Sequence, residues 1–144
     1  MERRVTHSLV SALRDVPGFE SVDERVLLAL IGESANLYWL AGSTVFRRAT
    51  PADGLYIVIS GSVRVVGEDG VTRATLGAGD FFGEMSLLLD TTHHQDVVVD
   101  EYAELMVIPK EKFDELMASH EDVRRHVRAK AKERAAAGAS PAMR

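Results

Sequence analysis

Through the middle of the chain, apolar side chains recur at every second position, and this period restricts the fold more than any other feature. Leu55, Ile57 and Ile59 form one such run. A period of two places successive side chains on opposite faces of a β-strand. The runs are separated by turn sequences, densest at residues 50–54, and about seven or eight short strands result. This spacing is typical of a small antiparallel barrel or jelly roll. We therefore predict a mainly β domain built as an antiparallel β-roll with flanking helices.

The predicted strands are short, and two of the turns between them have specific sequences. Ser60-Gly61 predicts a tight turn, and Asp69-Gly70 predicts a type I′ hairpin turn. We expect strands at residues 37–40, 44–47, 55–59, 63–65 and 72–76, and a final pair of strands at 96–100 and 103–108.

Two amphipathic helices are predicted before the strands. Residues 6–16 carry apolar side chains on one face, and Pro17-Gly18 predicts the end of that helix. Ser21 and Glu24 form a capping box, in which Ser21 is the N-cap and Glu24 is the third helical residue. The second helix is expected to run to about Ala35.

Two further helices are predicted after the strands. Pro109 suits the start of a helix, and residues 110–119 have amphipathic spacing. Residues 121–137 predict a longer, mostly charged helix with a thin, exposed-looking apolar stripe of Val123, Val127 and Ala131. The expected organisation is one domain with N-terminal helices at 1–35, a β-roll at 36–108, C-terminal helices at 109–137 and a flexible tail at 138–144.

Composition and charge disfavour several classes of function. The net charge of −5 argues against a general nucleic-acid-binding protein, so we expect no direct contact with nucleic acid. No apolar run reaches the roughly 18 residues that a membrane span requires. The absence of cysteine excludes disulfides and thiolate metal sites and fits a cytoplasmic protein.

Residues 79–88 contain the strongest candidate for a ligand site. Gly79 and Gly83 bracket the diaromatic Phe81-Phe82, and Glu84 follows the second glycine. Glycine allows backbone geometry that a side chain would block, and it lets a ligand approach the main chain. A Gly-Glu step that opens a helical turn directs free N–H groups toward one point, which suits an anion. We therefore predict that this segment cradles an anionic ligand.

These features together resemble the cyclic nucleotide-binding domain family, the regulatory β-roll of catabolite-activator-type regulators, cyclic-nucleotide-dependent kinases and cyclic-nucleotide-gated channels. The resemblance covers about residues 8–134 and is carried by Gly42, residues 52–65 and residues 79–88. It implies a regulatory, non-enzymatic sensor that binds cyclic AMP or cyclic GMP in the roll and moves its C-terminal helix in response. The family's phosphate-binding cassette corresponds to residues 79–97.

The first half of this cassette matches the family, and the second half departs from it. The family's Glu after the glycine accepts a hydrogen bond from the ribose 2′-hydroxyl, a role that the resemblance assigns to Glu84. An arginine in a Pro-Arg-Ser/Thr-Ala segment pairs with the cyclic phosphate. The family prefers glycine at the place of Ala49 and a neutral residue at the place of Asp96. The four residues that replace the Pro-Arg-Ser/Thr-Ala segment here are Thr92, His93, His94 and Gln95.

Loss of the arginine changes the expected affinity. Removal of a buried bidentate contact costs about 2–4 kcal/mol, which is roughly tens to a thousandfold in affinity. Histidine has an ordinary pKa of about 6.5 and is mostly neutral at pH 7, unless a bound phosphate or Asp96 raises that pKa. We expect weak or pH-dependent cyclic nucleotide binding, or a different ligand. The predicted ligand-binding residues are Phe82, Gly83, Glu84, Met85, Ser86, His93, His94 and, as a cap over the base, Arg128.

Each of these residues also has a structural interpretation. Glu84 fits a structural acid, Phe81-Phe82 fits the core, and His93-His94 fits an exposed loop. A second hypothesis is a degenerate roll that binds no nucleotide and acts as an interaction or dimerisation module through its last helix. A third is a cupin-like metal protein that uses the two histidines and Asp96, although adjacent strand residues point to opposite faces.

Overall fold

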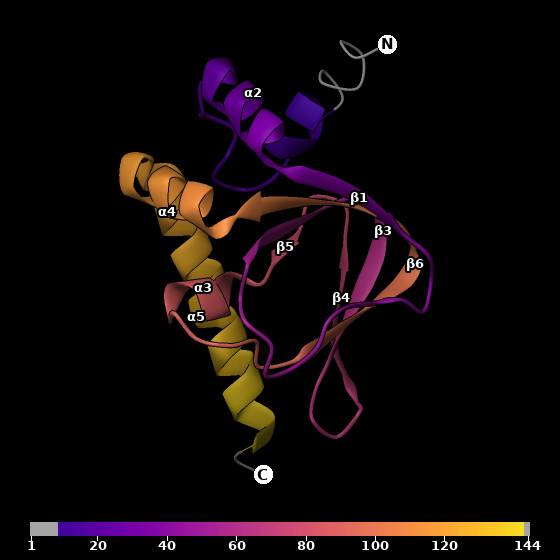
Figure 1. Ribbon diagram of the computed structural model, residues 1–144. Helices are drawn as coiled ribbons and strands as arrows, with labels where there is room; N and C mark the ends of the chain where they lie inside the picture. The colour runs from indigo at the N-terminus through magenta and orange to yellow at the C-terminus, as the bar shows by residue number, and fades with distance from the viewer. Residues whose placement is uncertain (1–8, 143–144) are drawn as a thin grey trace.

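The computed structural model describes residues 9–142, with side chains described to residue 136, and its centre is a six-stranded antiparallel sheet curled into a roll (Figure 1). The strand order is β1-β6-β3-β4, and β2 and β5 pair with β6 and β3. The predicted antiparallel β-roll with flanking helices is confirmed. The strands are β1 (Ala35–Trp39), β2 (Thr44–Phe46), β3 (Gly54–Val66), β4 (Thr72–Gly77), β5 (Phe81–Phe82) and β6 (Asp96–Pro109). The labelled helices are α2 (Glu24–Glu33), α3 (Glu84–Leu88), α4 (Lys110–Ser119) and α5 (Glu121–Ala142).

Two long strands, β3 and β6, lie at the centre of the sheet. They pair antiparallel from Gly54 opposite Pro109 to Val66 opposite Asp96. The predicted final pair of strands is wrong, because β6 is one continuous strand over its 14 residues. The predicted tight turn at Ser60-Gly61 is also wrong, because β3 continues through it with a shift of register. Such a shift is a β-bulge, which bends a strand without ending it.

The hairpin between β3 and β4 differs from its predicted turn type. The backbone N–H of Gly70 donates to the carbonyl of Gly67 at 3.0 Å, so Glu68 and Asp69 are the central residues of this turn. A type I′ turn requires positive φ at both central residues. Here the positive φ falls on Gly70 instead, at 79°. The hairpin predicted at this place therefore forms, but with a different turn.

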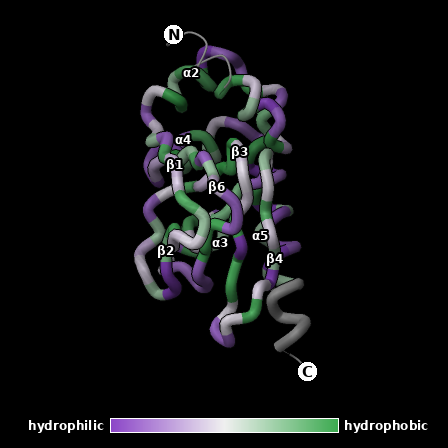
Figure 2. Tube along the Cα trace, turned by 90° about the vertical axis from the view of Figure 1, so that its right-hand side faces the viewer, coloured by the Kyte–Doolittle hydropathy of each residue, from purple (hydrophilic) through white to green (hydrophobic). Residues whose placement is uncertain are grey.

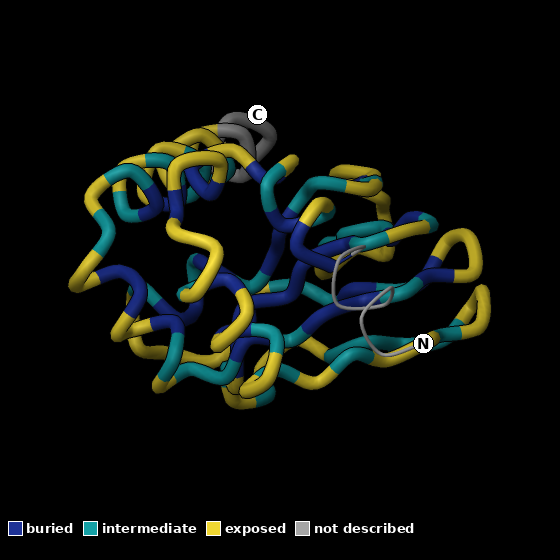
Figure 3. The backbone as a smooth tube through the Cα atoms, turned by 90° about the horizontal axis from the view of Figure 1, so that it is seen from above, coloured by how far each residue is buried: buried dark blue, intermediate teal, exposed yellow. Residues whose placement is uncertain are grey.

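Buried side chains form two clusters, and the sheet separates them. One cluster lies between the roll and the helices and includes Phe19, Leu27 and Phe113. The other fills the roll and includes Val63 and Leu105. The alternation of hydrophobic and hydrophilic residues can be followed along the chain in Figure 2. In Figure 3 the connecting loops are mostly exposed, whereas the strands carry many of the buried residues.

The apolar stripe of α5 packs inside this molecule. Val123 and Val127 have no exposed surface and belong to the cluster beneath the helices. The prediction of an exposed-looking stripe is therefore wrong, and these two valines offer no surface for a partner. They instead anchor the first half of α5 to the domain. The backbone of α5 is helical to Ala142, beyond the predicted end at 137, whereas the flexibility predicted for residues 138–144 stays a prediction.

The N-terminal helices form, but their predicted ends need correction. The first described helical segment covers residues 9–14, and the rest of its predicted start lies outside the described residues. Asp23 is the N-cap of α2, since its carboxylate accepts from the backbone N–H of Arg25 at 2.8 Å. The predicted cap, Ser21, instead donates its hydroxyl to Asp122 of α5 at 2.9 Å. The helix ends at Glu33, because the next strand begins at Ala35.

Replacement of Ala49 by glycine is expected to stabilise the domain. Ala49 is exposed and has a φ of 70°, in the left-handed region that disfavours side chains by about 1–2 kcal/mol. Glycine removes that strain, but its greater freedom in the unfolded chain lowers the stability by about 0.4–1 kcal/mol. We expect the free energy of unfolding to rise by about 0.5–1 kcal/mol in urea titrations. The exposed turn residue Ala41 provides a control, and an Ala41→Gly variant that gains as much would contradict this reason.

Candidate functional site

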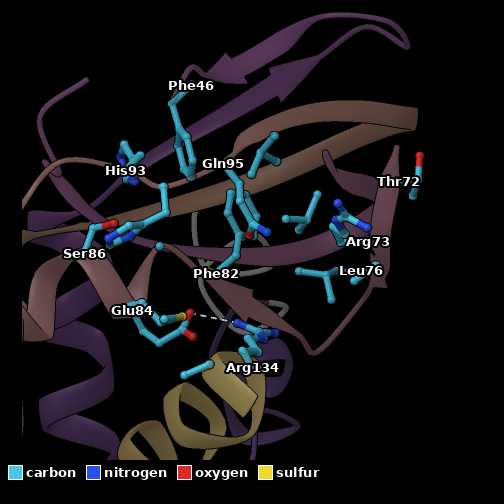
Figure 4. A pocket seen from close by; sticks show the side chains of 17 residues that line it. Phe46, Thr72, Arg73, Leu76, Phe82, Glu84, Ser86, His93, Gln95 and Arg134 are labelled. Atoms are coloured by element: carbon cyan, nitrogen blue, oxygen red, sulfur yellow. Dashed lines mark hydrogen bonds and ion pairs between the residues drawn. The ribbon is translucent and has the colours of Figure 1, made fainter. Parts of the chain in front are cut away.

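A cavity of about 530 Å³ opens between the roll, α3, the loop before β6 and the far half of α5 (Figure 4). Its lining combines aromatic and aliphatic side chains with polar and charged ones. Cavities of this size and mixed lining are typical of small-molecule sites. The lining residues include Phe46, Val65, Leu76, Phe82, Gly83, Glu84, Met85, Ser86, His93, His94, Val97 and Arg134.

Gly83 sets the geometry of the polar side of the cavity. It is the N-cap of α3 and has a φ of 87°, a conformation that glycine adopts without strain. A Cβ at this position would lie 3.3 Å from the carbonyl oxygen of Gly54 and 3.8 Å from Cε1 of His93. The side chains of Glu84 and Ser86, which follow Gly83 in α3, are buried. The Gly-Glu step at the start of a helical turn is therefore present, as the sequence predicts.

Glu84 is almost completely buried, and its two carboxylate oxygens have different surroundings. Its exposed fraction is 1%. Oε1 accepts a hydrogen bond from Nη1 of Arg134 at 2.7 Å (Figure 4), whereas Oε2 is buried without a partner among the described residues. Burial raises the pKa of Glu84, and the charge of Arg134 opposes that rise. The carboxylate thus contacts α5 through one oxygen only.

Arg134 is a site residue that the sequence analysis missed. Its guanidinium contacts Glu84 and lies 5.5 Å from the centre of the Phe81 ring, a cation–π distance. The predicted capping residue, Arg128, is exposed and does not line the cavity. The helical period contains a signal that distinguishes them. Arg134 follows Val127 by seven residues, two helical turns, and so shares the face of the buried valine.

His93 is buried in the cavity wall, so the interpretation as an exposed loop residue is wrong for it. Its exposed fraction is 3%, and its ring stacks on Phe46 with centroids 3.5 Å apart and an interplanar angle of 4°. Its backbone N–H donates to the carbonyl of Thr50 at 2.9 Å, and its carbonyl accepts from Ala49 at 2.8 Å. Nε2 is buried without a partner within the described part of the chain. The neighbouring His94 is exposed and lies at the rim.

Burial lowers the pKa of His93 from its ordinary value of 6.5, and the charge of Asp53 only partly opposes this. The expectation that Asp96 supports a protonated His93 is wrong, because Asp96 instead accepts from the backbone N–H of Arg48 at 2.6 Å. His93 is therefore neutral at pH 7 and donates or accepts hydrogen bonds without a charge.

The stability of the domain is expected to fall on acidification because of His93. A pKa lowered by folding means that the unfolded chain binds more protons below about pH 6.5. Stability from this group is fully present above that pH and is lost as the pH falls below it. We expect a His93→Gln variant to show a flatter dependence of the unfolding free energy between pH 7.5 and 5.5. Parallel profiles for the two proteins would contradict the lowered pKa.

Two neighbouring phenylalanines serve different parts of the molecule. Phe82 lines the cavity and stacks on Tyr56 with ring centroids 5.1 Å apart. Phe81 belongs to the cluster beneath the helices, where it faces the Arg134 guanidinium. Both are buried. An aromatic and aliphatic wall of this kind suits the faces of a flat ring.

The described residues support neither a metal site nor a membrane-spanning helix. No group of three or more His, Asp or Glu side chains among them could hold a metal ion, so the cupin-like hypothesis lacks a ligand set. In the same part of the chain, no helix is both long and apolar enough to cross a membrane.

The fold and the site define a ligand-binding β-roll whose cavity is bordered by a short helix and a C-terminal helix. A family model described as the cyclic nucleotide-binding domain matches residues 37–120, which is more than half of the chain. The chain therefore belongs to the cyclic nucleotide-binding domain family.

Several known proteins share this domain. Glutaminase 1 of Bradyrhizobium diazoefficiens is 39% identical over 80 residues, which cover 56% of this chain and 13% of that protein. The regulatory subunit of the cAMP-dependent protein kinase of Schizosaccharomyces pombe is 27% identical over 116 residues, which cover 81% of this chain and 28% of that one. The chain thus spans less than a third of the length of these curated relatives.

A solved structure has the same fold. The regulatory domain of Toxoplasma gondii protein kinase A, crystallised with cAMP, matches with a TM-score of 0.80 at 21% identity. The match covers 91% of this chain and 51% of that one. At this identity the likeness establishes the fold, which agrees with the roll described above.

Proposed function

We propose that this domain is a regulatory sensor that binds a cyclic nucleotide, cyclic AMP or cyclic GMP, in the cavity and transmits occupancy through α5. Family membership supports this ligand class. The observation that carries the proposal is the divided carboxylate of Glu84. One oxygen binds Arg134 of α5, and the other is buried, unpartnered among the described residues and part of the cavity lining. A ligand hydroxyl on the second oxygen would therefore bind to the same group that holds the helix.

In this proposal different cavity residues contact the sugar, the phosphate and the base of the ligand. Glu84 accepts from a sugar hydroxyl, and the backbone of Gly83 together with Met85 and Ser86 surrounds the sugar and phosphate. Phe82 supports the base. The phosphate place is occupied by His93 and, at the rim, His94. Arg128 has no part in this site, because it is exposed outside the cavity.

Coupling to α5 follows from where the helix is fixed. Val123 and Val127 hold its first half in the core. The far half contributes Arg134 to the site, so ligand occupancy biases this half between two positions. A ligand that binds the closed position more tightly stabilises that position by the difference in affinity.

The degenerate module is a weaker alternative. The cavity, with two buried polar atoms that lack partners among the described residues, favours a domain that binds a ligand. We propose that the domain is itself non-catalytic, works in the cytoplasm, and passes its state to a partner protein or a second copy through α5. The regulatory subunit among its relatives supports this role.

Replacement of Glu84 by glutamine tests the proposal. We expect cyclic AMP to lose about tenfold or more in affinity in isothermal titration, since a charge-assisted hydrogen bond becomes neutral. Ligand should slow hydrogen exchange in the far half of α5 of the native protein and have less effect there in the variant. Glu115→Gln, an exposed change of the same kind on α4, provides the control. Unchanged affinity in the Glu84 variant would contradict the assigned contact.

A further inference from the structure

Two buried polar atoms in the cavity lining lack hydrogen-bond partners within the described residues. They are Oε2 of Glu84 and Nε2 of His93. Their side chains are 1% and 3% exposed, so bulk water does not solvate them. Native proteins rarely leave such atoms unsatisfied, because each loses the free energy of a hydrogen bond. A ligand that presents hydrogen-bonding groups to both side chains would satisfy this pair.

The guanidinium groups in the cavity lining already have carboxylate partners. Arg134 binds Glu84 at 2.7 Å, and Arg73 of β4 binds Asp69 at 2.9 Å on the exposed hairpin. Neither is a free fixed cation. A charged ligand would have to compete with a carboxylate for either group.

The phosphate place itself holds an uncharged ring. His93 stacks flat on Phe46 and is 3% exposed, so protonation would place a charge where water does not reach it. The groups that act on it electrostatically are Asp53, which favours the charged form, and His94, which opposes it. Asp53 is also engaged by the Tyr56 hydroxyl at 3.1 Å. Burial outweighs Asp53, so the pKa of His93 is lowered and the ring is neutral at pH 7.

An anionic phosphodiester would lose its hydration here and gain no free cation from the described residues that line the cavity. An uncharged sugar with a flat base has no such penalty. Its hydroxyl donates to Oε2 of Glu84, another of its polar groups bonds Nε2 of His93, and its base packs against Phe82 and Leu76. We propose that, at neutral pH, this site binds an uncharged ribonucleoside more tightly than the corresponding cyclic nucleotide. The inference rests on the proposed function, because it uses the same cavity and the same Glu84 contact.

Isothermal titration of the native protein at pH 7.5 tests this preference. The probes are adenosine, guanosine, cyclic AMP and cyclic GMP, and 2′-deoxyadenosine, which lacks the hydroxyl for Glu84, serves as the matched control ligand. We expect each nucleoside to bind at least about tenfold more tightly than its cyclic nucleotide. We expect the affinity of 2′-deoxyadenosine to be about tenfold lower than that of adenosine. At pH 5.5, protonation of His93 should narrow the preference.

The outcomes separate the two proposals. A cyclic nucleotide that binds as tightly as its nucleoside, or more tightly, overturns the preference for an uncharged ligand and leaves the proposed function in place. No binding of any of the five probes at millimolar concentration overturns both.

Discussion

Replacement of His93 by arginine is expected to raise the affinity for cyclic AMP about 10- to 1000-fold at pH 7.5. The native ring is neutral and buried, whereas a guanidinium is charged at every accessible pH and offers a planar fork to a phosphodiester. A buried contact of this kind is worth about 2–4 kcal/mol, and about 1.4 kcal/mol corresponds to tenfold in affinity. Isothermal titration of native and variant proteins with cyclic AMP measures the gain directly.

His94→Arg is the matched control for this variant. It adds the same charge one residue away, on an exposed side chain at the rim of the cavity. Solvent screens such a charge, so we expect a change of no more than about threefold. Equal gains from the two variants would assign the effect to net charge. No gain from His93→Arg, in a variant that melts cooperatively, would show that residue 93 is not the phosphate place.

Replacement of Arg134 by glutamine is expected to release the far half of α5. Glu84 would keep a buried carboxylate without its cation. The loss of one partner from a fully buried ion pair costs about 3–5 kcal/mol. The Arg134 side chain is 24% exposed, so we expect a smaller loss of about 2 kcal/mol. Hydrogen exchange in α5 beyond Ala131 should then be about 30-fold faster, whereas the segment that contains Val123 and Val127 should remain protected.

Arg128→Gln provides the comparison for Arg134→Gln on the same helix. It removes an identical side chain that is exposed and outside the cavity. We expect hydrogen exchange and ligand affinity of this variant to match those of the native protein. If Arg128→Gln loosens α5 as much as Arg134→Gln does, the contact between Arg134 and Glu84 does not hold the helix.

Local sequence pattern predicted the roll because each of its cues acts over a few residues. Alternation, glycines and turn sequences report directly on strand and loop geometry. The Ser60-Gly61 turn failed because the same glycine also suits a bulge. The carbonyl of Tyr102 on the opposite strand leaves no room for a Cβ at Gly61, which is information that no local window contains.

The site was predictable only where its geometry is local. Gly83 and Glu84 are adjacent, so the sequence alone indicated the Gly-Glu step at the start of a helical turn, whereas the sugar contact of Glu84 was implied by the family resemblance. The burial of His93 depends on Phe46, which comes from a strand far away in the sequence. Arg134 could have been predicted from the helical period, since it follows Val127 by two turns. That prediction required the apolar stripe of α5 to be interpreted as buried. Contacts made across the fold are the part that sequence pattern does not contain.

Because Val123 and Val127 fix the first half of α5 in the core, a rotation of the helix near Val127 displaces its far end more than the residues near the cavity. At about 1.5 Å per residue, roughly 10 Å of helix separates Val127 from Arg134, and roughly 22 Å separates it from Ala142. A pivot of about 10° near Val127 would displace Arg134 by about 2 Å and the far end by about 4 Å. Glu84 binds Arg134, which lies close to Val127. A small displacement of Arg134 would therefore produce the largest displacement at the C-terminal end of α5, farthest from the ligand.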